Sequence, residues 1–244
     1  MAYLSVRGLS LEYPISSRVG RAPQRRSALS IGSMLSRIGG STVVRALDQI
    51  SFDLVDGDRL ALVGANGSGK SSLLMALAGI FEPKTGQVVS EGRIQALFNV
   101  RLGFRMEATG RRNVLLRGLL DGWSRRDIAE RMDEIIAFSD LEDYIDLPMH
   151  TYSQGMAARL AFAAATSIRP DILLLDEWIG AGDRAFQRKA KKRMESIVSD
   201  AGIVVMASHN DSLLRSICNK ALLLRQGRVE RFGEIGDVLA ATDR

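Results

Sequence analysis

The chain has 244 residues, a formal net charge of +5 and a hydrophobic content of 46%, which suit one large globular domain or a domain with a subdomain. No apolar run reaches the roughly 18 residues that a membrane-spanning helix needs, and the N-terminus MAYLSVRGLSLEY lacks the apolar core of a secretory signal. We therefore expect a folded protein that does not cross a membrane by itself. The single cysteine, Cys218, excludes a disulfide within the chain, fits the cytosol and is expected to serve packing.

The excess positive charge is concentrated near the N-terminus. The interval between Glu12 and Asp48 holds no acidic residue and contains six arginines, namely Arg18, Arg21, Arg25, Arg26, Arg37 and Arg45. Such a block can bind nucleic acid, anionic lipid or an acidic partner, or it can be a solvated arm, and the composition leaves these alternatives open.

Part of this interval has a helical pattern. Four apolar residues recur at the spacing of one helical face, namely Ile31, Met34, Leu35 and Ile38. With Ser30 as a start and Gly39 as an end, the pattern predicts a short amphipathic helix.

The predicted elements follow one another in a simple order. Alternating segments at 4–13 and 46–55 predict strands on either side of the basic insertion. The run RLALVG predicts a strand that enters a glycine-rich turn and a helix ending near Gly79, and residues 103–165 have a helical pattern in which Ser124 caps one helix. Three apolar runs then alternate with helical stretches: DILLLD, GIVVMAS and ALLLRQG. This alternation predicts an α/β fold with a largely parallel sheet.

The glycine-rich turn matches the phosphate-loop pattern G-x-x-x-x-G-K-[ST] between a strand and a helix. Its residues, with the serine that follows, are Gly64, Ala65, Asn66, Gly67, Ser68, Gly69, Lys70, Ser71 and Ser72. Backbone N–H groups of such a loop turn toward phosphate oxygens, and the helix N-terminus adds its positive end. Lys70 is expected to reach the β- and γ-phosphates and Ser71 to bind Mg²⁺. The pattern therefore predicts nucleotide binding.

Two acids and a histidine follow other predicted strands. Asp176 ends the run ILLLD, where a carboxylate can hold Mg²⁺ through water, and Glu177 can polarise the attacking water; the alternative for this pair is a helix cap. His209 follows GIVVMAS and can orient the water at the γ-phosphate, with a structural histidine as the alternative. The acidic pair of Asp176 and Glu177 favours hydrolysis of the nucleotide over transfer of its phosphate to a substrate.

A serine, an amide and a glycine, Ser153, Gln154 and Gly155, precede an alanine-rich helix in YSQGM. Alone they could be an N-cap. The order of phosphate loop, helical segment, YSQGM, LLLDE strand and histidine resembles the nucleotide-binding domain of ATP-binding cassette transporters, from about Tyr3 to Val238. That resemblance implies ATP and Mg²⁺ as cofactors and a homodimer in which these three residues bind the γ-phosphate held by the partner's phosphate loop.

Further site residues are implied by the resemblance. Tyr13 matches the aromatic residue that stacks on adenine, with strand packing as the alternative. Asp183 matches the loop that bridges the subunits. Asn99 lies near the place of the glutamine that senses the membrane partner, and we include Asn99 with Ser71 and Asp176 among the candidate metal-site residues. Gln154 and Met156 depart from the usual signature LSGGQ.

The resemblance also implies a P-loop NTPase fold of the α/β class, with a mostly parallel core sheet, an antiparallel β subdomain and an inserted α-helical signature subdomain. We place the core and β subdomain at residues 1–102 and 166–244, the basic insertion at 14–42 and the helical subdomain at 103–165.

A narrower likeness concerns what the family member transports. The YS-x-GM signature, the stretch LGF-x-x-x-x-TGRRN and the basic insertion look like those of the ATPase subunits that export lipid-linked polysaccharides such as O-antigen, capsule or teichoic acid. This implies a separate dimeric membrane permease that handles the glycan, a peripheral place on the cytoplasmic face of the inner membrane and no nucleic acid. The alternatives are another importer or exporter ATPase of this family, or a soluble one that acts on nucleic acid or ribosomes.

Overall fold

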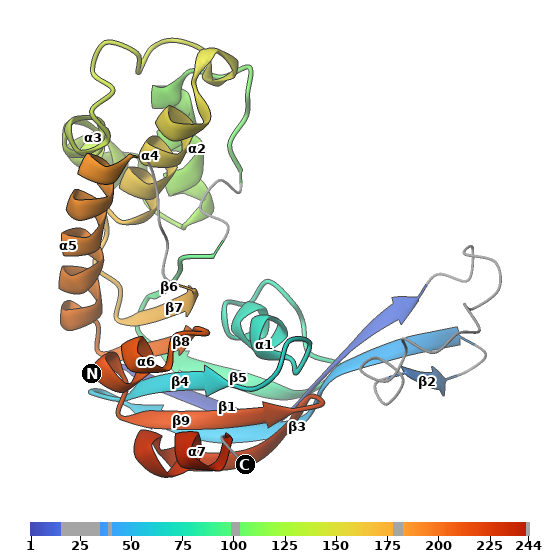
Figure 1. Ribbon diagram of the computed structural model, residues 1–244. Coiled ribbons are helices and arrows are strands. Elements are labelled where there is room, and N and C mark those ends of the chain that lie inside the picture. Colours follow the sequence, from blue (N-terminus) through green and yellow to red (C-terminus); the bar gives the residue numbers. More distant parts are fainter. Residues whose placement is uncertain (16–34, 39–40, 99–102, 178–182, 243–244) are drawn as a thin grey trace. The chain divides into compact units, whose positions relative to one another are not determined.

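The structure is a computed structural model that describes residues 1–15, 35–38, 41–98, 103–177 and 183–242 (Figure 1). The described chain divides into two compact units. The core unit comprises Met1–Ala96, Asp171–Glu177 and Gly202–Arg244, and the helical unit comprises Leu97–Pro170 and Trp178–Ala201. The subdomain limits given above stay a prediction. Among the described residues, no helix has the length and apolar character needed to span a membrane.

The core unit contains two sheets. The first is antiparallel, in the order β2 (Leu35–Ile38), β3 (Ser41–Val55), β1 (Tyr3–Ile15) and β5 (Thr85–Glu91). The second runs in the order β10 (Arg228–Glu234), β9 (Lys220–Arg225), β4 (Arg59–Val63), β8 (Ile203–Ala207), β7 (Ile172–Asp176) and β6 (Ile94–Ala96). Its strands pair in parallel, except that β10 is antiparallel to β9. The predicted fold class is confirmed.

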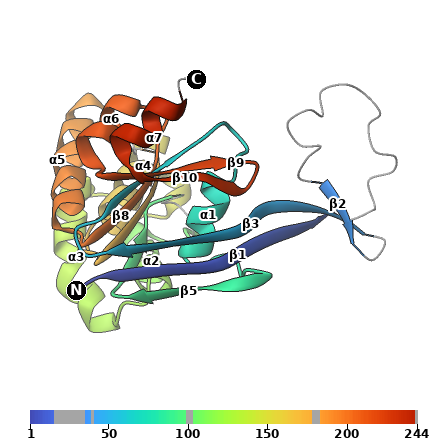
Figure 2. The same cartoon turned by 90° about the horizontal axis from the view of Figure 1, so that it is seen from below.

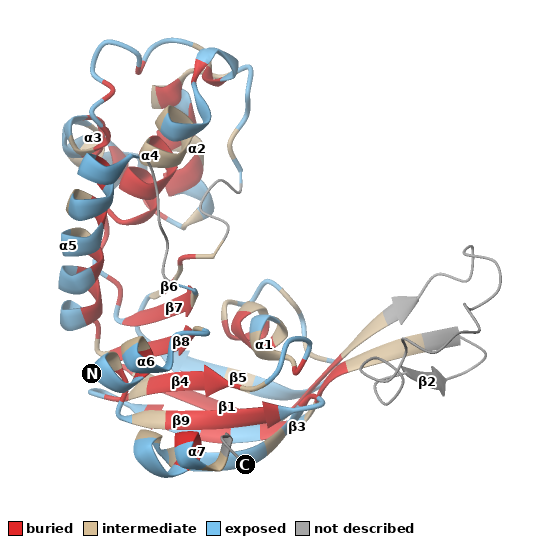
Figure 3. Ribbon diagram, in the orientation of Figure 1, coloured by how far each residue is buried: buried red, intermediate tan, exposed pale blue. Residues whose placement is uncertain are grey.

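Aliphatic strands at the centre of the parallel sheet place the site. Residues of β4, β7 and β8 are almost all buried, as expected for strands covered on both faces (Figure 3). Because the three strands are parallel neighbours, the segments that follow them emerge at one edge of the sheet. These segments carry the phosphate loop, Glu177 and His209. The register, in which Ala207 pairs with both Leu62 and Asp176, brings the three strand ends level.

Three helices complete the core unit: α1 (Lys70–Leu77), α6 (Asp211–Ile217) and α7 (Ile235–Thr242). Helix α1 contacts β7 and β8 of the parallel sheet and β3 of the antiparallel one, so it joins the two sheets. Helix α7 packs beside β9 and β10 (Figure 2).

The helical unit contains α2 (Gly110–Leu120), α3 (Arg125–Ser139), the short 3₁₀ helix Met149–Thr151, α4 (Gln154–Ala165) and α5 (Arg184–Asp200). Ser124 caps α3 as predicted, in a reciprocal capping box with Asp127. Rings from α3, α4 and α5 meet at centroid distances of 5.6 to 6.2 Å, namely those of Phe138, Phe162 and Phe186. Asn113, fully buried in α2, donates to the carbonyl oxygens of residues 105, 108 and 109 and so holds the preceding loop.

The predicted amphipathic helix between Ser30 and Gly39 is wrong. Its second half is strand β2, which pairs antiparallel with β3 from Leu35 to Ile38, while residues 30–34 lie outside the described residues. A helix of about ten residues is marginal alone in water, whereas the facing segment STVV offers β-branched residues and a ladder of backbone hydrogen bonds. Gly39, taken as the helix end, is followed by a second glycine, and in sequence such a pair is also a typical signal of a hairpin turn.

Candidate functional site

The phosphate loop connects β4 with α1 and lies close against two neighbouring strands. Gly64 and Gly69 have left-handed φ angles of 138° and 112°. A Cβ atom at Gly64 would stand 2.2 Å from the Leu224 carbonyl oxygen, and one at Gly69 would stand 2.8 Å from that of Ala46. Both positions therefore need glycine for backbone angle and for space.

The hairpin turn between β9 and β10 is hydrogen-bonded to the phosphate loop. The Gly227 N–H, between β9 and β10, donates to the Ser68 carbonyl oxygen at 2.9 Å, and the Asp48 N–H donates to the Gly227 carbonyl oxygen at 2.8 Å. The loop is thus connected through Gly227 to β3.

The start of α1 is suited to bind an anion. Among the described residues no side chain caps this helix, and no acid lies in its first turn, so its first N–H groups and its positive end are available. Lys70 Nζ donates to the carbonyl oxygens of Gly64 at 2.7 Å and Ala65 at 3.1 Å, which places its ammonium group across the loop. Burial lowers the Lys70 pKa, and the charges of Asp176 and Glu177 act in the opposite direction. Lys70 thus supplies a positive charge in the position that a bound phosphate requires.

The acidic pair and the histidine meet at the adjoining strand ends. Asp176 is the last residue of β7. Glu177 takes a left-handed φ of 68°, and its N–H donates to the Ala207 carbonyl oxygen at 2.8 Å. The exposed Glu177 carboxylate lies 3.6 Å from His209 Nε2. The structure therefore brings the two predicted catalytic side chains together.

One cavity of about 700 Å³ collects most of the predicted nucleotide residues. Those that line it are Tyr13, Asn66, Gly67, Gly69, Lys70, Ser71, Ser72, Asp176, Glu177 and His209. The Ser71 hydroxyl and Asp176 carboxylate supply the oxygen ligands that Mg²⁺ prefers, so these residues fit that ion. The cavity thus brings together the Lys70 ammonium group, the N-terminus of α1 and the carboxylates of Asp176 and Glu177.

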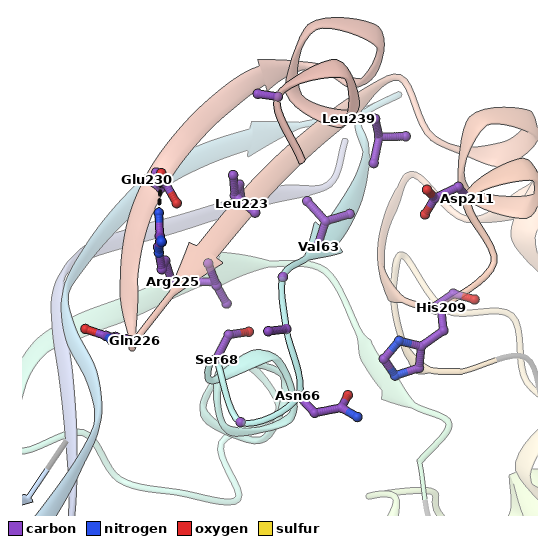
Figure 4. A pocket seen from close by; sticks show the side chains of 16 residues that line it. Val63, Asn66, Ser68, His209, Asp211, Leu223, Arg225, Gln226, Glu230 and Leu239 are labelled. Atoms are coloured by element: carbon purple, nitrogen blue, oxygen red, sulfur yellow. Dashed lines mark hydrogen bonds and ion pairs between the residues drawn. The ribbon is translucent and has the colours of Figure 1, made fainter. Parts of the chain in front are cut away.

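A second cavity, of about 640 Å³, also borders the loop (Figure 4). It is lined by the remaining loop residues Gly64, Ala65 and Ser68, by leucines of β9 and α7 and by the Arg225–Glu230 ion pair of 3.3 Å. Asn66, Gly67, Ser208 and His209 line both cavities. The loop and the segment carrying His209 thus border both cavities.

Tyr13 lies in the wall of the first cavity, where β1 passes α1. Its hydroxyl donates to Ser72 Oγ at 3.2 Å, and its ring meets Phe81 edge-on with centroids 5.4 Å apart. Phe81 was not among the expected site residues, because no local pattern links it to a tyrosine 68 positions earlier.

The other candidates belong to the helical unit. Ser153 caps α4 by accepting from the Met156 N–H at 3.2 Å, and Gln154 and Gly155 are exposed in the first turn. Asp183 caps α5, and hydrogen bonds from the N–H groups of Phe186 and Ala185 lower the pKa of its carboxyl. Asn99 lies outside the described residues. The capping reading of Ser153 holds in this chain, and the exposed start of α4, without an acid, is also suited to an anion.

Comparisons with known proteins agree with this geometry. Residues 47–180 match the family model of the ABC transporter. The chain is 40% identical to the O-antigen export system ATP-binding protein RfbE of Yersinia enterocolitica, covering 98% of this chain and 100% of that protein. It is 35% identical to the teichoic acids export ATP-binding protein TagH of Bacillus cereus, over 80% of this chain and 35% of that protein. Among solved structures, the dimeric ATP-binding cassette MJ0796 bound to ADP and Pi has a similar fold, with a TM-score of 0.66, 19% identity and coverage of 95% and 98%.

Proposed function

The chain belongs to the ABC transporter family, and we propose that it hydrolyses ATP to power the export of a lipid-linked polysaccharide through a separate membrane permease. The observation that carries this proposal is the 40% identity to an O-antigen export ATP-binding protein along that protein's whole length. The cavity beside the phosphate loop supplies the chemistry that such a protein needs.

Five side chains that line the cavity take part in the proposed hydrolysis. The N–H groups at the start of α1 and the Lys70 ammonium hold the β- and γ-phosphates. Ser71, and Asp176 through water, would hold Mg²⁺, which offsets the charge on the phosphate oxygens. Glu177 accepts the proton of the attacking water, and His209, 3.6 Å from Glu177, orients that water toward the γ-phosphate.

The helical unit would act on the nucleotide of a second copy. In the proposed head-to-tail homodimer, Ser153, Gln154 and Gly155 bind the γ-phosphate held by the partner's phosphate loop, and Asp183 lies in the loop that bridges the subunits. The exposed start of α4, without an acid in its first turn, supports this role. ATP binding closes the dimer and hydrolysis opens it, and this change of conformation drives the permease.

The proposed location is the cytoplasmic face of the inner membrane, where the chain docks on two permease subunits and binds no nucleic acid. The test is the lipid-linked material in cells that lack this protein. An undecaprenyl-linked polymer should accumulate while the same glycan disappears from the surface. Unchanged envelope glycans and no accumulated intermediate would reject the polysaccharide assignment.

A further inference from the structure

The Tyr13 side chain contacts the helix that follows the phosphate loop and the segment just after that helix. Ser72, which accepts the hydrogen bond of its hydroxyl, lies in the first turn of α1, and Phe81, which meets its ring, follows the end of that helix. Tyr13 itself belongs to β1 of the antiparallel sheet. Its side chain is therefore held by two residues that lie 59 and 68 positions away in the sequence.

These contacts differ from those of a core side chain. Tyr13 is only partly buried, and it lines the same cavity as Lys70 and Ser71. Its cross-strand neighbour in β3, Val44, lines that cavity too. A tyrosine side chain has two torsions, so one hydrogen bond and one ring contact are enough to select its orientation. The orientation is thus defined at the cavity wall, where a ligand would meet the ring.

We propose that Ser72 is a positioning residue for Tyr13, and that its hydrogen bond fixes the ring on which the nucleotide base stacks. The inference rests on the proposed ATP-binding function and adds a coupling within that site. Ser72 directly follows Ser71 in the first turn of α1, so the turn that carries the phosphate and metal contacts also holds the ring. Base and triphosphate are then recognised by one preorganised body, which lowers the ordering cost of binding.

The hydrogen bond can be removed from either end. Tyr13→Phe keeps the ring and loses the hydroxyl, so the affinity for Mg-ATP should fall about 2- to 10-fold, as for one hydrogen bond. Ser72→Ala removes the same bond together with any phosphate contact of its own. The loss in the double variant should therefore be smaller than the product of the single losses. Ser72→Thr keeps a hydroxyl and should restore most of the affinity.

The experiment measures Mg-ATP affinity directly for the four members of this cycle, with KM and kcat for ATP hydrolysis alongside. A positioning role raises KM and leaves kcat of Tyr13→Phe unchanged. Tyr3→Phe is the matched control, because it makes the same substitution on the same strand at an exposed hydroxyl 3.4 Å from Asp53. It should leave ATP affinity unchanged, and a thermal midpoint for each variant identifies losses that come from unfolding.

Two results would overturn the inference: full ATP affinity in Tyr13→Phe, or losses in the double variant that multiply. Multiplying losses would mean that Ser72 binds phosphate independently of Tyr13. A wild-type chain that binds no Mg-ATP would instead overturn the proposed function and this inference with it.

Discussion

Gly227 does not line the nucleotide cavity, yet replacing it with alanine should disturb the phosphate loop. Gly227 has a φ of 77°, and a Cβ atom there would stand 2.6 Å from the Ala46 carbonyl oxygen and 3.1 Å from its carbon. The left-handed angle costs an alanine about 1–2 kcal/mol, and crowding of backbone in a packed site adds about 1–3 kcal/mol. We therefore expect Gly227→Ala to lower the free energy of unfolding by about 2–5 kcal/mol.

A second glycine separates the two contributions. Gly122 has a nearly equal φ of 79°, and no atom of the described residues lies within 4 Å of its hypothetical Cβ atom. Gly122→Ala should therefore lower the free energy of unfolding only by the cost of the left-handed backbone angle, about 1–2 kcal/mol. The difference between the two variants, measured by urea unfolding, estimates the crowding at Gly227.

The crowding should also affect ATP binding, because the Gly227 N–H donates to the Ser68 carbonyl oxygen. If about 1 kcal/mol of the strain is relieved by shifting the loop, the affinity for Mg-ATP falls about fivefold. Direct binding measurements on folded protein would show this loss for Gly227→Ala and none for Gly122→Ala. Equal stability of the two variants, together with equal ATP affinity, would refute the argument that this hairpin supports the loop.

Four other changes have defined outcomes. Lys70→Ala should lose tight ATP binding in a direct assay, because the phosphate charge then lacks its cation; undiminished affinity would remove Lys70 from the site. A mixture of Lys70→Ala and Ser153→Arg subunits should regain part of the ATPase activity, because the heterodimer keeps one whole composite site; verified heterodimers as inactive as both parents would contradict action across the dimer. Deleting residues 18–40 should preserve ATP binding, because Ile15 and Thr42, which pair across β1 and β3, are then joined by three serines, a length suited to a hairpin loop. The same deletion should lower export; wild-type export by this variant would exclude a coupling role. Burial raises the pKa of the Cys218 thiol to about 12, so alkylation at pH 8 should be slow until urea unfolds the chain; rapid labelling of folded protein would contradict its buried place.

Local patterns were enough to predict the parallel strands and the phosphate loop. The runs that form β4, β7 and β8 are continuous and aliphatic because both faces of these strands are buried. Each of Lys70, Asp176, Glu177 and His209 was assigned to the same nucleotide, and because parallel strands end at one edge these residues line one cavity.

Patterns failed where pairing rather than burial decides the structure. The strand β10, RVERFGE, is mostly exposed at the edge of its sheet, so it has no apolar run to identify it. β2 was taken for a helix because its apolar spacing suits one, while its hydrogen-bonding partner β3 lies later in the chain. The contacts of Tyr13 with Ser72 and Phe81 depend on how β1 passes α1, which no single segment encodes.

The most direct test of the account compares wild type with Glu177→Gln in cells that lack the native protein. Glutamine keeps the size and hydrogen bonding of Glu177 but cannot accept the proton of the attacking water, so the variant should bind Mg-ATP and fail to turn it over. With equal amounts of each protein present, wild type should restore surface polysaccharide and clear the lipid-linked intermediate, and Glu177→Gln should leave that intermediate accumulated. Restoration of export and of ATP hydrolysis by Glu177→Gln to the wild-type level would contradict the claim that this carboxylate drives polysaccharide export.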